Sequence, residues 1–308
     1  MPLSYAELEE FYEDLVSEAR RRGVACAITS GMACVAFGVA AATLDCDLLC
    51  SPETAEELFR MLQETCLRDR LPNYRGHLTA PLDLRWLSGG WTSHFCWSPP
   101  NEEAYLDIFG IPPRGTSPWA AEFQGLYAGL HTVAEMKRTD RDKDWPFATA
   151  LGLKLLETGD QRGWLHLFNL EVLRETSKQL PCPAEMIALR PVLSLLAEGD
   201  DRLEIALKAE IEFWHRLDQL RLKVYERALR PYMLAVKREA LCDPPSSLAV
   251  QHGARLKLAG DLLPFNPLRE YGIDRLIDET KGKTAEMLPS GALRWLPDAS
   301  ECFKFLSK

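Results

Sequence analysis

Two aspartates, Asp45 and Asp47, are the residues of this chain whose type and spacing best suit metal chemistry. Side chains on a strand repeat every two residues, so both carboxylates are expected on one face of the strand-like segment 44–50. Mg²⁺ prefers oxygen ligands, and two carboxylates together with substrate phosphates are a usual supply. A D-x-D pair is common by itself, because aspartates at strand ends often cap a turn or pair with a nearby arginine.

A third carboxylate on a neighbouring strand would complete a site for two metal ions. Asp107 is the best candidate, because it lies within the apolar strand-like segment 104–110, where an unpaired charge would be costly. Asp83 is a weaker competitor on the same grounds. Ser30 and Gly31 lie between a strand-like and a helix-like segment, where backbone N–H groups could hold a phosphate.

Hydrophobic periodicity and turn chemistry predict the elements that must position these residues. The first helix carries a Ser4–Glu7 capping box, and a later helix begins with Pro52 in its first turn. In chain order, we expect a helix over 4–22, a buried strand over 24–29, a small helix over 32–40, the acidic strand over 44–50, a helix over 51–65, and short strands over 82–87, 91–97 and 104–110.

From Trp119 onward the chain is predicted to be helical to about Leu241, with a long helix from Asp201 that breaks at Pro231. Residues 243–247 have the composition of a linker. The fold class is therefore α+β: a small mixed sheet with helices over residues 1–148, a mainly helical domain over 149–241, and an extension over 242–308 whose structure is not assigned. The sheet region is too short for a doubly wound dinucleotide fold, and it has neither a G-x-G-x-x-G nor a P-loop motif.

Bulk composition narrows the classes of function. The 308 residues carry a formal net charge of -9, which argues against a broad electrostatic grip on nucleic acid but not against a local basic groove. We find no apolar run long enough to cross a bilayer, and the N-terminus lacks the order of a signal peptide. The nine cysteines are scattered without a C-x-x-C pair, so a reduced, cytoplasmic protein is the simplest expectation.

The order of these motifs resembles the signature of the nucleotidyltransferase superfamily, in particular its minimal and AbiEii-like or MenT-like toxin branches. A turn, a helix and an acidic-x-acidic strand carry the resemblance, and a later Lys-Arg and Asp arrangement extends it to about residues 24–148. The matching residues are Ile28-Thr29-Ser30-Gly31-Met32-Ala33, Phe37-Gly38, Thr43-Leu44-Asp45-Cys46-Asp47-Leu48-Leu49, His131-Thr132-Val133-Ala134-Glu135-Met136-Lys137-Arg138 and Arg141-Asp142-Lys143-Asp144.

The resemblance implies a nucleotidyltransferase-like domain that uses Mg²⁺ or Mn²⁺ to transfer a nucleoside monophosphate from an NTP to an acceptor hydroxyl. Its acceptor could be a tRNA end, a protein side chain or a small molecule, and no membrane partner is implied. By similarity, the metal-binding and catalytic residues are Asp45, Asp47 and Asp107, and the nucleotide-binding residues are Ser30, Gly31, Lys137, Arg141 and Asp144.

Two departures from the family pattern bear on substrate binding. The turn reads Ser-Gly instead of Gly-Gly or Gly-Ser, so Ser30 occupies a position usually held by glycine. Ala41 occupies a position where relatives often carry an arginine, and the missing positive charge could weaken nucleotide binding or signal another substrate. Neither departure removes a metal ligand.

Two other functions compete with nucleotidyl transfer. A non-catalytic nucleotidyltransferase-like domain could bind a partner, and a phosphotransferase could use the same site to move a γ-phosphate. Several residues also have ordinary structural interpretations. Lys137 can be a surface charge, His94 a structural histidine and Arg114 a solvated arginine. The aromatic residues Trp86, Trp91, Phe95 and Trp97 can pack a hairpin, and the stripe Phe213, Trp214, Leu217, Leu220 and Val224 can be core or a protein-partner surface.

Overall fold

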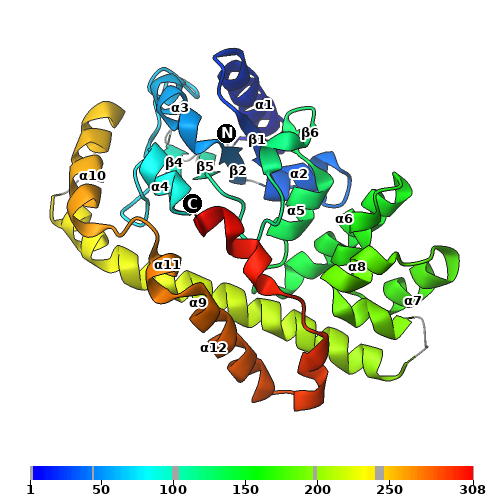
Figure 1. Ribbon diagram of the computed structural model, residues 1–308. Helices are drawn as coiled ribbons and strands as arrows, with labels where there is room; N and C mark the ends of the chain where they lie inside the picture. The colour runs from blue at the N-terminus through cyan, green and yellow to red at the C-terminus, as the bar shows by residue number, and fades with distance from the viewer. Residues whose placement is uncertain (1–2, 44, 99–103, 197–199, 240–245, 308) are drawn as a thin grey trace. The chain divides into compact units, whose positions relative to one another are not determined.

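The computed structural model describes residues 3–43, 45–98, 104–196, 200–239 and 246–307, and its fold class is α+β, as predicted (Figure 1). The chain forms two compact units that are interleaved in sequence, and each is described by itself. Unit 1 comprises Met1–Pro112, Pro118–Ala128 and Val224–Pro267, and unit 2 comprises Pro113–Ser117, Gly129–Lys223 and Leu268–Lys308. These units differ from the predicted segments 1–148, 149–241 and 242–308, because the chain returns to the sheet unit after residue 223.

Unit 1 is built on a mixed seven-stranded sheet with the order β3-β4-β5-β2-β1-β7-β6. At its centre, β2 runs antiparallel to β1 and parallel to β5, and β5 runs antiparallel to β4. In chain order, the strands are β1 (Cys26–Thr29), β2 (Asp45–Cys50), β3 (Asn73–Tyr74), β4 (Thr92–Trp97), β5 (Ala104–Phe109), β6 (Phe123–Gln124) and β7 (Tyr127–Ala128).

Helices α1 and α3 lie over one face of this sheet (Figure 1). The hydrophobic core beneath them includes Tyr12 of α1, Leu58 of α3 and Leu48 of β2, all of them fully buried. Each such side chain stabilises the fold by about 1.5–3 kcal/mol through removal of apolar surface from water. The helices of unit 1 are α1 (Tyr5–Arg21), α2 (Ser30–Ala36), α3 (Ala55–Leu62), α4 (Leu84–Ser88), α10 (Leu248–Leu262) and the later part of α9 (Arg202–Arg238).

Local signals in the sequence account for several of these elements. Helix α1 begins at the predicted capping box, in which the Ser4 side chain accepts from the Glu7 backbone N–H and the Glu7 carboxylate accepts from the Ser4 backbone N–H. The predicted strands over 24–29, 44–50, 91–97 and 104–110 correspond to β1, β2, β4 and β5. These predictions are confirmed.

Three predictions of secondary structure are wrong. Segment 82–87 forms the start of α4 instead of a strand, because Asp83 caps the helix by accepting from the Arg85 backbone N–H. The chain after Trp119 is not helical throughout, since β6 and β7 form a hairpin around Gly125, whose φ of 61° suits a tight turn. Helix α9 continues through Pro231, whose exposed ring faces solvent while Leu229 and Tyr232 are buried.

Unit 2 is mainly helical. Its elements are α5 (Leu130–Met136), η3 (Asp142–Asp144), α6 (Trp145–Glu157), η4 (Gln161–His166), α7 (Leu170–Gln179), α8 (Ala184–Leu189), η5 (Pro191–Leu196), the first part of α9, α11 (Pro267–Tyr271), α12 (Ile273–Ala285), η6 (Ser290–Trp295) and η7 (Ala299–Ser307). Most of the described part of the unassigned extension is thus helical. Of the predicted linker, residues 243–245 lie outside the described residues, and Ser247 caps α10 by accepting from the Val250 backbone N–H.

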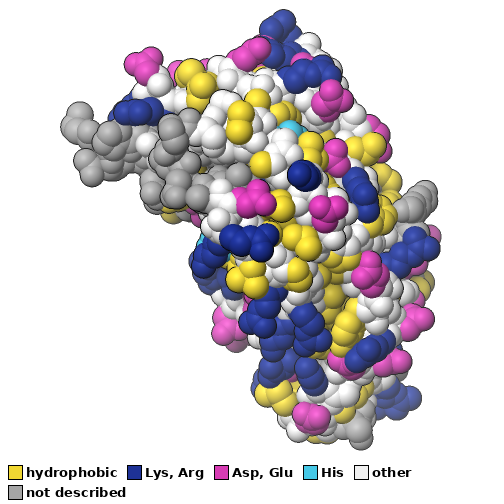
Figure 2. Space-filling model, turned by 90° about the vertical axis from the view of Figure 1, so that its left-hand side faces the viewer, with side chains coloured by type: hydrophobic (Ala, Val, Ile, Leu, Met, Phe, Trp, Pro, Cys, Tyr) yellow, Lys and Arg dark blue, Asp and Glu magenta, His cyan; other side chains and the backbone are white. Residues whose placement is uncertain are grey.

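Charge is unevenly distributed over the surface. Figure 2 shows Lys and Arg side chains gathered on part of one face, although the chain is acidic overall. In unit 1, the exposed residues Arg227, Arg230 and Lys237 follow one face of α9, since they are spaced by three and seven residues. None of the helices formed by the described residues combines the length and apolarity that a bilayer span requires.

Candidate metal and nucleotide site

The structure aligns the predicted carboxylates across the centre of the sheet. Asp47 of β2 lies opposite Asp107 of β5 in the parallel register, and Asp107 lies opposite His94 of β4. On the other side, Thr29 at the end of β1 lies opposite Asp47. Thr29, Asp47, Asp107 and His94 therefore form one row across four adjacent strands, which we call the carboxylate row.

The carboxylate row lies on the sheet face opposite the α1–α3 core. Cys46, Leu48, Leu106 and Ile108 point into that core, and the residues between them must face the other way because side chains alternate along a strand. Cys46 is 1% exposed, and burial raises the pKa of its thiol well above the ordinary value. Cys46 therefore lies on the opposite face of β2 from Asp45 and Asp47.

Two side chains, those of Arg75 and His94, contact the Asp107 carboxylate. One terminal nitrogen of Arg75 donates to both carboxylate oxygens, at 2.8 and 3.0 Å, and His94 Nδ1 lies 2.8 Å from Oδ1. The Arg75 guanidinium also lies 4.8 Å from the centre of the Tyr105 ring. The side chains of Arg75 and Asp107 are 34% and 18% exposed, so this ion pair remains in contact with solvent.

Asp45 shares the face of Asp47 but lies in the next row of the sheet. It is opposite Tyr105 in the β2–β5 register, and its side chain is exposed. The predicted placement of Asp45 and Asp47 on one face is therefore confirmed, and Asp107 lies beside Asp47 on the neighbouring strand.

The donor atoms of this face suit a hard divalent cation, which prefers carboxylate oxygens. Among the described residues, however, no three His, Cys, Asp or Glu side chains are gathered closely enough to hold an ion. Arg75 donates hydrogen bonds to both carboxylate oxygens of Asp107, so the guanidinium and a cation would compete for the same carboxylate. Metal binding by Asp45, Asp47 and Asp107 remains a prediction.

Ser30 and Gly31 follow β1 directly and are the first residues of α2, so this helix begins and ends earlier than the predicted 32–40. Ser30 has a φ of 51°, in the left-handed region that favours glycine, which is the physical meaning of the serine departure noted above. A Cβ added at Gly31 would lie 2.8 Å from Thr43 Oγ1, so this position needs glycine for close approach of the chain. Their contact with phosphate remains a prediction.

The other predicted nucleotide-binding residues lie together in unit 2, where Lys137 and Asp144 are buried and Arg141 is exposed. Lys137 Nζ lies 3.4 Å from Asp144 Oδ1, while Thr139 Oγ1 and Arg141 Nε donate to Oδ2 at 2.6 and 2.7 Å. Burial by itself raises the pKa of the Asp144 carboxyl, but the Lys137 charge and these hydrogen bonds outweigh it and lower the pKa. Lys137 is only 6% exposed, so it is not the solvated surface lysine of the alternative interpretation.

The remaining candidates take structural places. Asp83 is a helix cap, and the aromatic residues Trp86, Trp91, Phe95 and Trp97 are buried in the cores of unit 1. Arg114 is buried instead of solvated; it pairs with Asp218 and donates to the Met136 carbonyl at 2.8 Å. The stripe on α9 is core, since Phe213 and Leu217 are fully buried.

Arg75 and the group formed by His131, Glu135 and His166 carry no sequence signal that predicts them as site residues. Arg75 precedes β4 in an irregular segment without a motif, so only the pairing of β3 with β4 places it near Asp107. His131 and Glu135 are four residues apart on α5, a spacing that could have revealed their contact. His166 lies 35 residues further along the chain from His131 and could not be paired with it from sequence.

Comparison of the chain with protein-family models, with curated proteins and with solved structures found no match.

Proposed function

We propose that unit 1 is a metal-dependent nucleotidyltransferase domain, which moves a nucleoside monophosphate from an NTP to an acceptor hydroxyl. The observation that carries this proposal is the register of the sheet. It sets Asp47 beside Asp107 on adjacent parallel strands, with Asp45 on the same face and away from the hydrophobic core. Acidic side chains on a partly exposed sheet face are well placed to meet a cation and the phosphates it carries.

In this proposal, Asp45, Asp47 and Asp107 hold Mg²⁺ or Mn²⁺. The bound ion would polarise the α-phosphate and neutralise charge on the pyrophosphate, which leaves as the acceptor oxygen bonds to the α-phosphorus. Asp107 accepts the proton of the acceptor hydroxyl, and His94 orients its carboxylate through the 2.8 Å contact between Nδ1 and Oδ1. Arg75 would have to release Asp107 to such an ion, and its guanidinium would then be available to pair with phosphate oxygens.

The proposal leaves the acceptor open among a tRNA end, a protein side chain and a small molecule. A toxin-like role and a cytoplasmic location are part of it; in that compartment NTPs are available and thiols such as Cys46 and Cys66 stay reduced. Lys137, Arg141 and Asp144 are retained as predicted nucleotide-binding residues, but the proposal for unit 1 does not depend on them.

Binding without catalysis is a second candidate function, and the Arg75–Asp107 ion pair favours it. A domain that uses Asp107 only as a structural anion would keep this carboxylate neutralised by an arginine, as it is here. A phosphotransferase that moves the γ-phosphate would need the same acids as a nucleotidyltransferase, so the position of the transferred phosphorus must separate the two.

The test follows the label from ATP carrying ³²P at either the α or the γ position, with Mg²⁺ or Mn²⁺ present. The acceptors are mixed tRNA, the protein itself and an aminoglycoside. We expect α-label to be transferred, and Asp47→Asn and Asp107→Asn each to reduce the rate by at least about a hundredfold. Asp83→Asn is the matched control, because asparagine caps a helix as well as aspartate does and the rate should not change.

Transfer of γ-label instead would establish the phosphotransferase. If neither label is transferred to any acceptor while labelled ATP still binds, the non-catalytic alternative is favoured. Equal rates for the wild-type protein and both row variants would exclude the carboxylate row as the catalytic site.

A further inference from the structure

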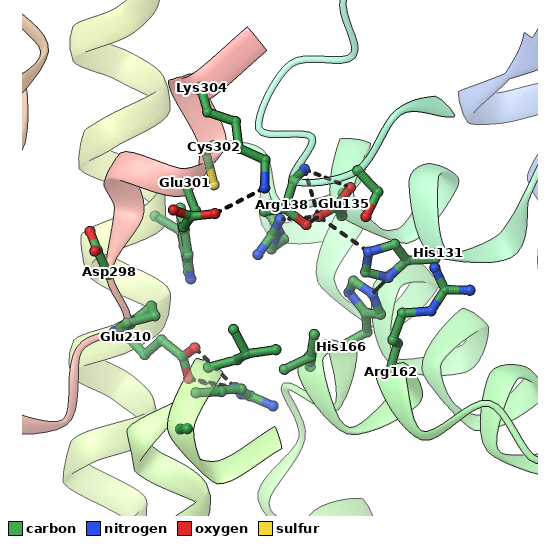
Figure 3. Close-up of a pocket in the computed structure, with 18 residues that line it drawn as sticks. His131, Glu135, Arg138, Arg162, His166, Glu210, Asp298, Glu301, Cys302 and Lys304 are labelled. Atoms are coloured by element: carbon green, nitrogen blue, oxygen red, sulfur yellow. Dashed lines mark hydrogen bonds and ion pairs between the residues drawn. The ribbon is translucent and has the colours of Figure 1, made fainter. Parts of the chain in front are cut away.

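Unit 2 contains a cavity of about 520 Å³ that the proposed function does not use. Its walls come from α5, η4, α9 and η7, which lie far apart in the sequence. Figure 3 shows that Glu301, Cys302 and Lys304 lie across this cavity from His131 and His166. The volume falls within the range of sites that bind small organic molecules.

Most of the charged groups in the wall already neutralise one another. Arg190 Nη2 lies 2.9 Å from Glu210 Oε2, and Lys304 Nζ lies 2.9 Å from Glu301 Oε2. Glu135 accepts from the Thr116 backbone N–H at 3.0 Å and from Arg138 Nη2 at 3.4 Å. These pairs shape the cavity, but they leave little carboxylate charge without a partner.

Three nitrogen atoms of the lining residues differ from these pairs. Arg138 Nε, His166 Nδ1 and Trp214 Nε1 are buried, and no atom of the described residues makes a hydrogen bond with any of them. Their residues are 7%, 0% and 2% exposed. An unmade hydrogen bond at a buried donor is costly, so a ligand oxygen that reaches these nitrogens from the cavity, after a shift of the side chains that cover them, would form a bond that the protein leaves unmade.

The chemistry of these nitrogens restricts the ligand. Arg138 Nε–H and Trp214 Nε1–H are donors in every protonation state, so the ligand must present acceptor oxygens to them. The Arg138 guanidinium lies 4.7 Å from the centre of the Trp214 ring, which brings the two donors to the same part of the wall. Because arginine keeps its positive charge, a negatively charged oxygen is the best acceptor.

The apolar part of the lining adds a second requirement. Leu165, Leu189 and Pro297 also line the cavity, and Leu189 is 54% exposed, which is unusual for a leucine beside a concave site. An organic body attached to the acidic group would cover these side chains and bury their surface.

We propose that the cavity of unit 2 binds a small organic acid, whose carboxylate or phosphate oxygens accept hydrogen bonds from Arg138 and Trp214 and whose apolar body packs against Leu165 and Leu189. His166 belongs to the same wall, and its Nδ1–H donates a third hydrogen bond to this acidic group in the tautomer whose Nε2 accepts from His131 Nδ1. The proposal concerns unit 2 alone and does not rest on the nucleotidyltransferase function.

Isothermal titration of the full chain with benzoate, phenyl phosphate and benzyl alcohol tests this proposal. The three probes share one aromatic body and differ in the polar group. We expect one or both acids to bind at least tenfold more tightly than the alcohol, and the tighter acid distinguishes a carboxylate site from a phosphate site. Binding of none of them, or equal binding of all three, would overturn the proposal.

A pair of tryptophan variants locates the site. Trp214→Phe removes the indole N–H together with part of the ring, and we expect the affinity for the preferred acid to fall roughly tenfold, which corresponds to the loss of one hydrogen bond to a charged group. Trp164→Phe is the matched control, since its Nε1 is equally buried and unpartnered in unit 2 but Trp164 is not among the residues that line the cavity. Equal affinities of the two variants would exclude Trp214 from the site.

Arg138→Lys supplies a second, independent variant. It keeps the positive charge but loses the Nε donor and the planar group stacked on Trp214. We expect affinity for the acid to fall by about tenfold while affinity for benzyl alcohol is unchanged. An unchanged affinity for the acid would show that the oxyanion does not contact Arg138.

Discussion

The carboxylate row of unit 1 and the cavity wall of unit 2 use similar residue types under different conditions of burial. In the row, the Arg75 and Asp107 side chains are 34% and 18% exposed. In the cavity wall, the Arg190 and Glu210 side chains are 3% and 2% exposed, and Arg190 also donates to two backbone carbonyls. The first pair can exchange a partner for water or an ion, whereas the second has no solvent to replace what it would lose.

The difference shows why composition alone is a poor guide to a site. A partly hydrated carboxylate can change partners during a reaction cycle at little cost in folding stability. A buried ion pair is strongly coupled to the fold, so it is better suited to shape a cavity than to take part in exchange. The candidate functional groups of the cavity are accordingly its unpartnered nitrogens and not its ion pairs.

Removal of the arginine from each ion pair should give the largest difference in the free energy of unfolding between the two regions. Arg190→Leu leaves the Glu210 carboxylate buried without its partner, so we expect the free energy of unfolding to fall by about 3–5 kcal/mol. Arg75→Leu should cost no more than about 1 kcal/mol, because Asp107 remains hydrated and keeps its contact with His94. Urea denaturation of both variants provides the measurement, and similar losses would refute the assigned difference in burial.

The pH dependence of folding stability should show that His166 in the cavity wall is buried and neutral. Burial, assisted by the charges of His131 and nearby arginines, holds the pKa of His166 well below its ordinary value of 6.5. Below pH 6.5 the unfolded chain therefore binds a proton that the folded chain does not. The stability contributed by neutral His166 is complete above pH 6.5 and is lost as the pH falls, by up to about 1.4 kcal/mol per pH unit.

His166→Asn should reduce this slope between pH 6.5 and 5, as measured by chemical denaturation at several pH values. His252 in unit 1, whose pKa burial lowers to about 4, contributes a slope of the same sign in this range, so the variant should not abolish it. Because a slope is compared, a uniform loss of stability in the variant does not affect the result. An unchanged slope would contradict the assignment of a neutral, buried His166.

The turn that leads into α2 offers the smallest of these effects. Gly31→Ala should lower the free energy of unfolding by about 1–2 kcal/mol, because the new Cβ would lie 2.8 Å from Thr43 Oγ1. Ser30→Gly should raise it by about 0.5–1 kcal/mol, since relief of the left-handed conformation outweighs the added freedom of the unfolded chain.

Gly253→Ala is the control for the substitutions at Ser30 and Gly31. It lies in α10 with nothing within 4 Å of the added Cβ, so alanine there should stabilise the helix by about 0.5–1 kcal/mol. Thermal denaturation at one pH compares all three variants. A stabilising Gly31→Ala would show that Thr43 is not in close contact with this turn.

Local chemistry allowed part of this structure to be predicted. The capping box at Ser4, the alternation that puts Asp45 and Asp47 on one face, and the apolar strand around Asp107 all depend on residues close together in the chain. The prediction of a strand over 82–87 is wrong because a six-residue apolar pattern fits both the strand period of two and the helix period of 3.6. The cap at Asp83 decides in favour of a helix.

The sequence by itself determined the α+β class, the main strands and the face on which the central acids lie, because these follow from periods of two and 3.6 residues. Only the tertiary structure decided that Asp107 is opposite Asp47 and that Arg75 donates hydrogen bonds to Asp107. Strand order and register are set by contacts between distant segments. The same holds for the cavity of unit 2. Its wall brings residue 138 together with residues 166, 214 and 302, and no local rule of spacing connects positions so far apart.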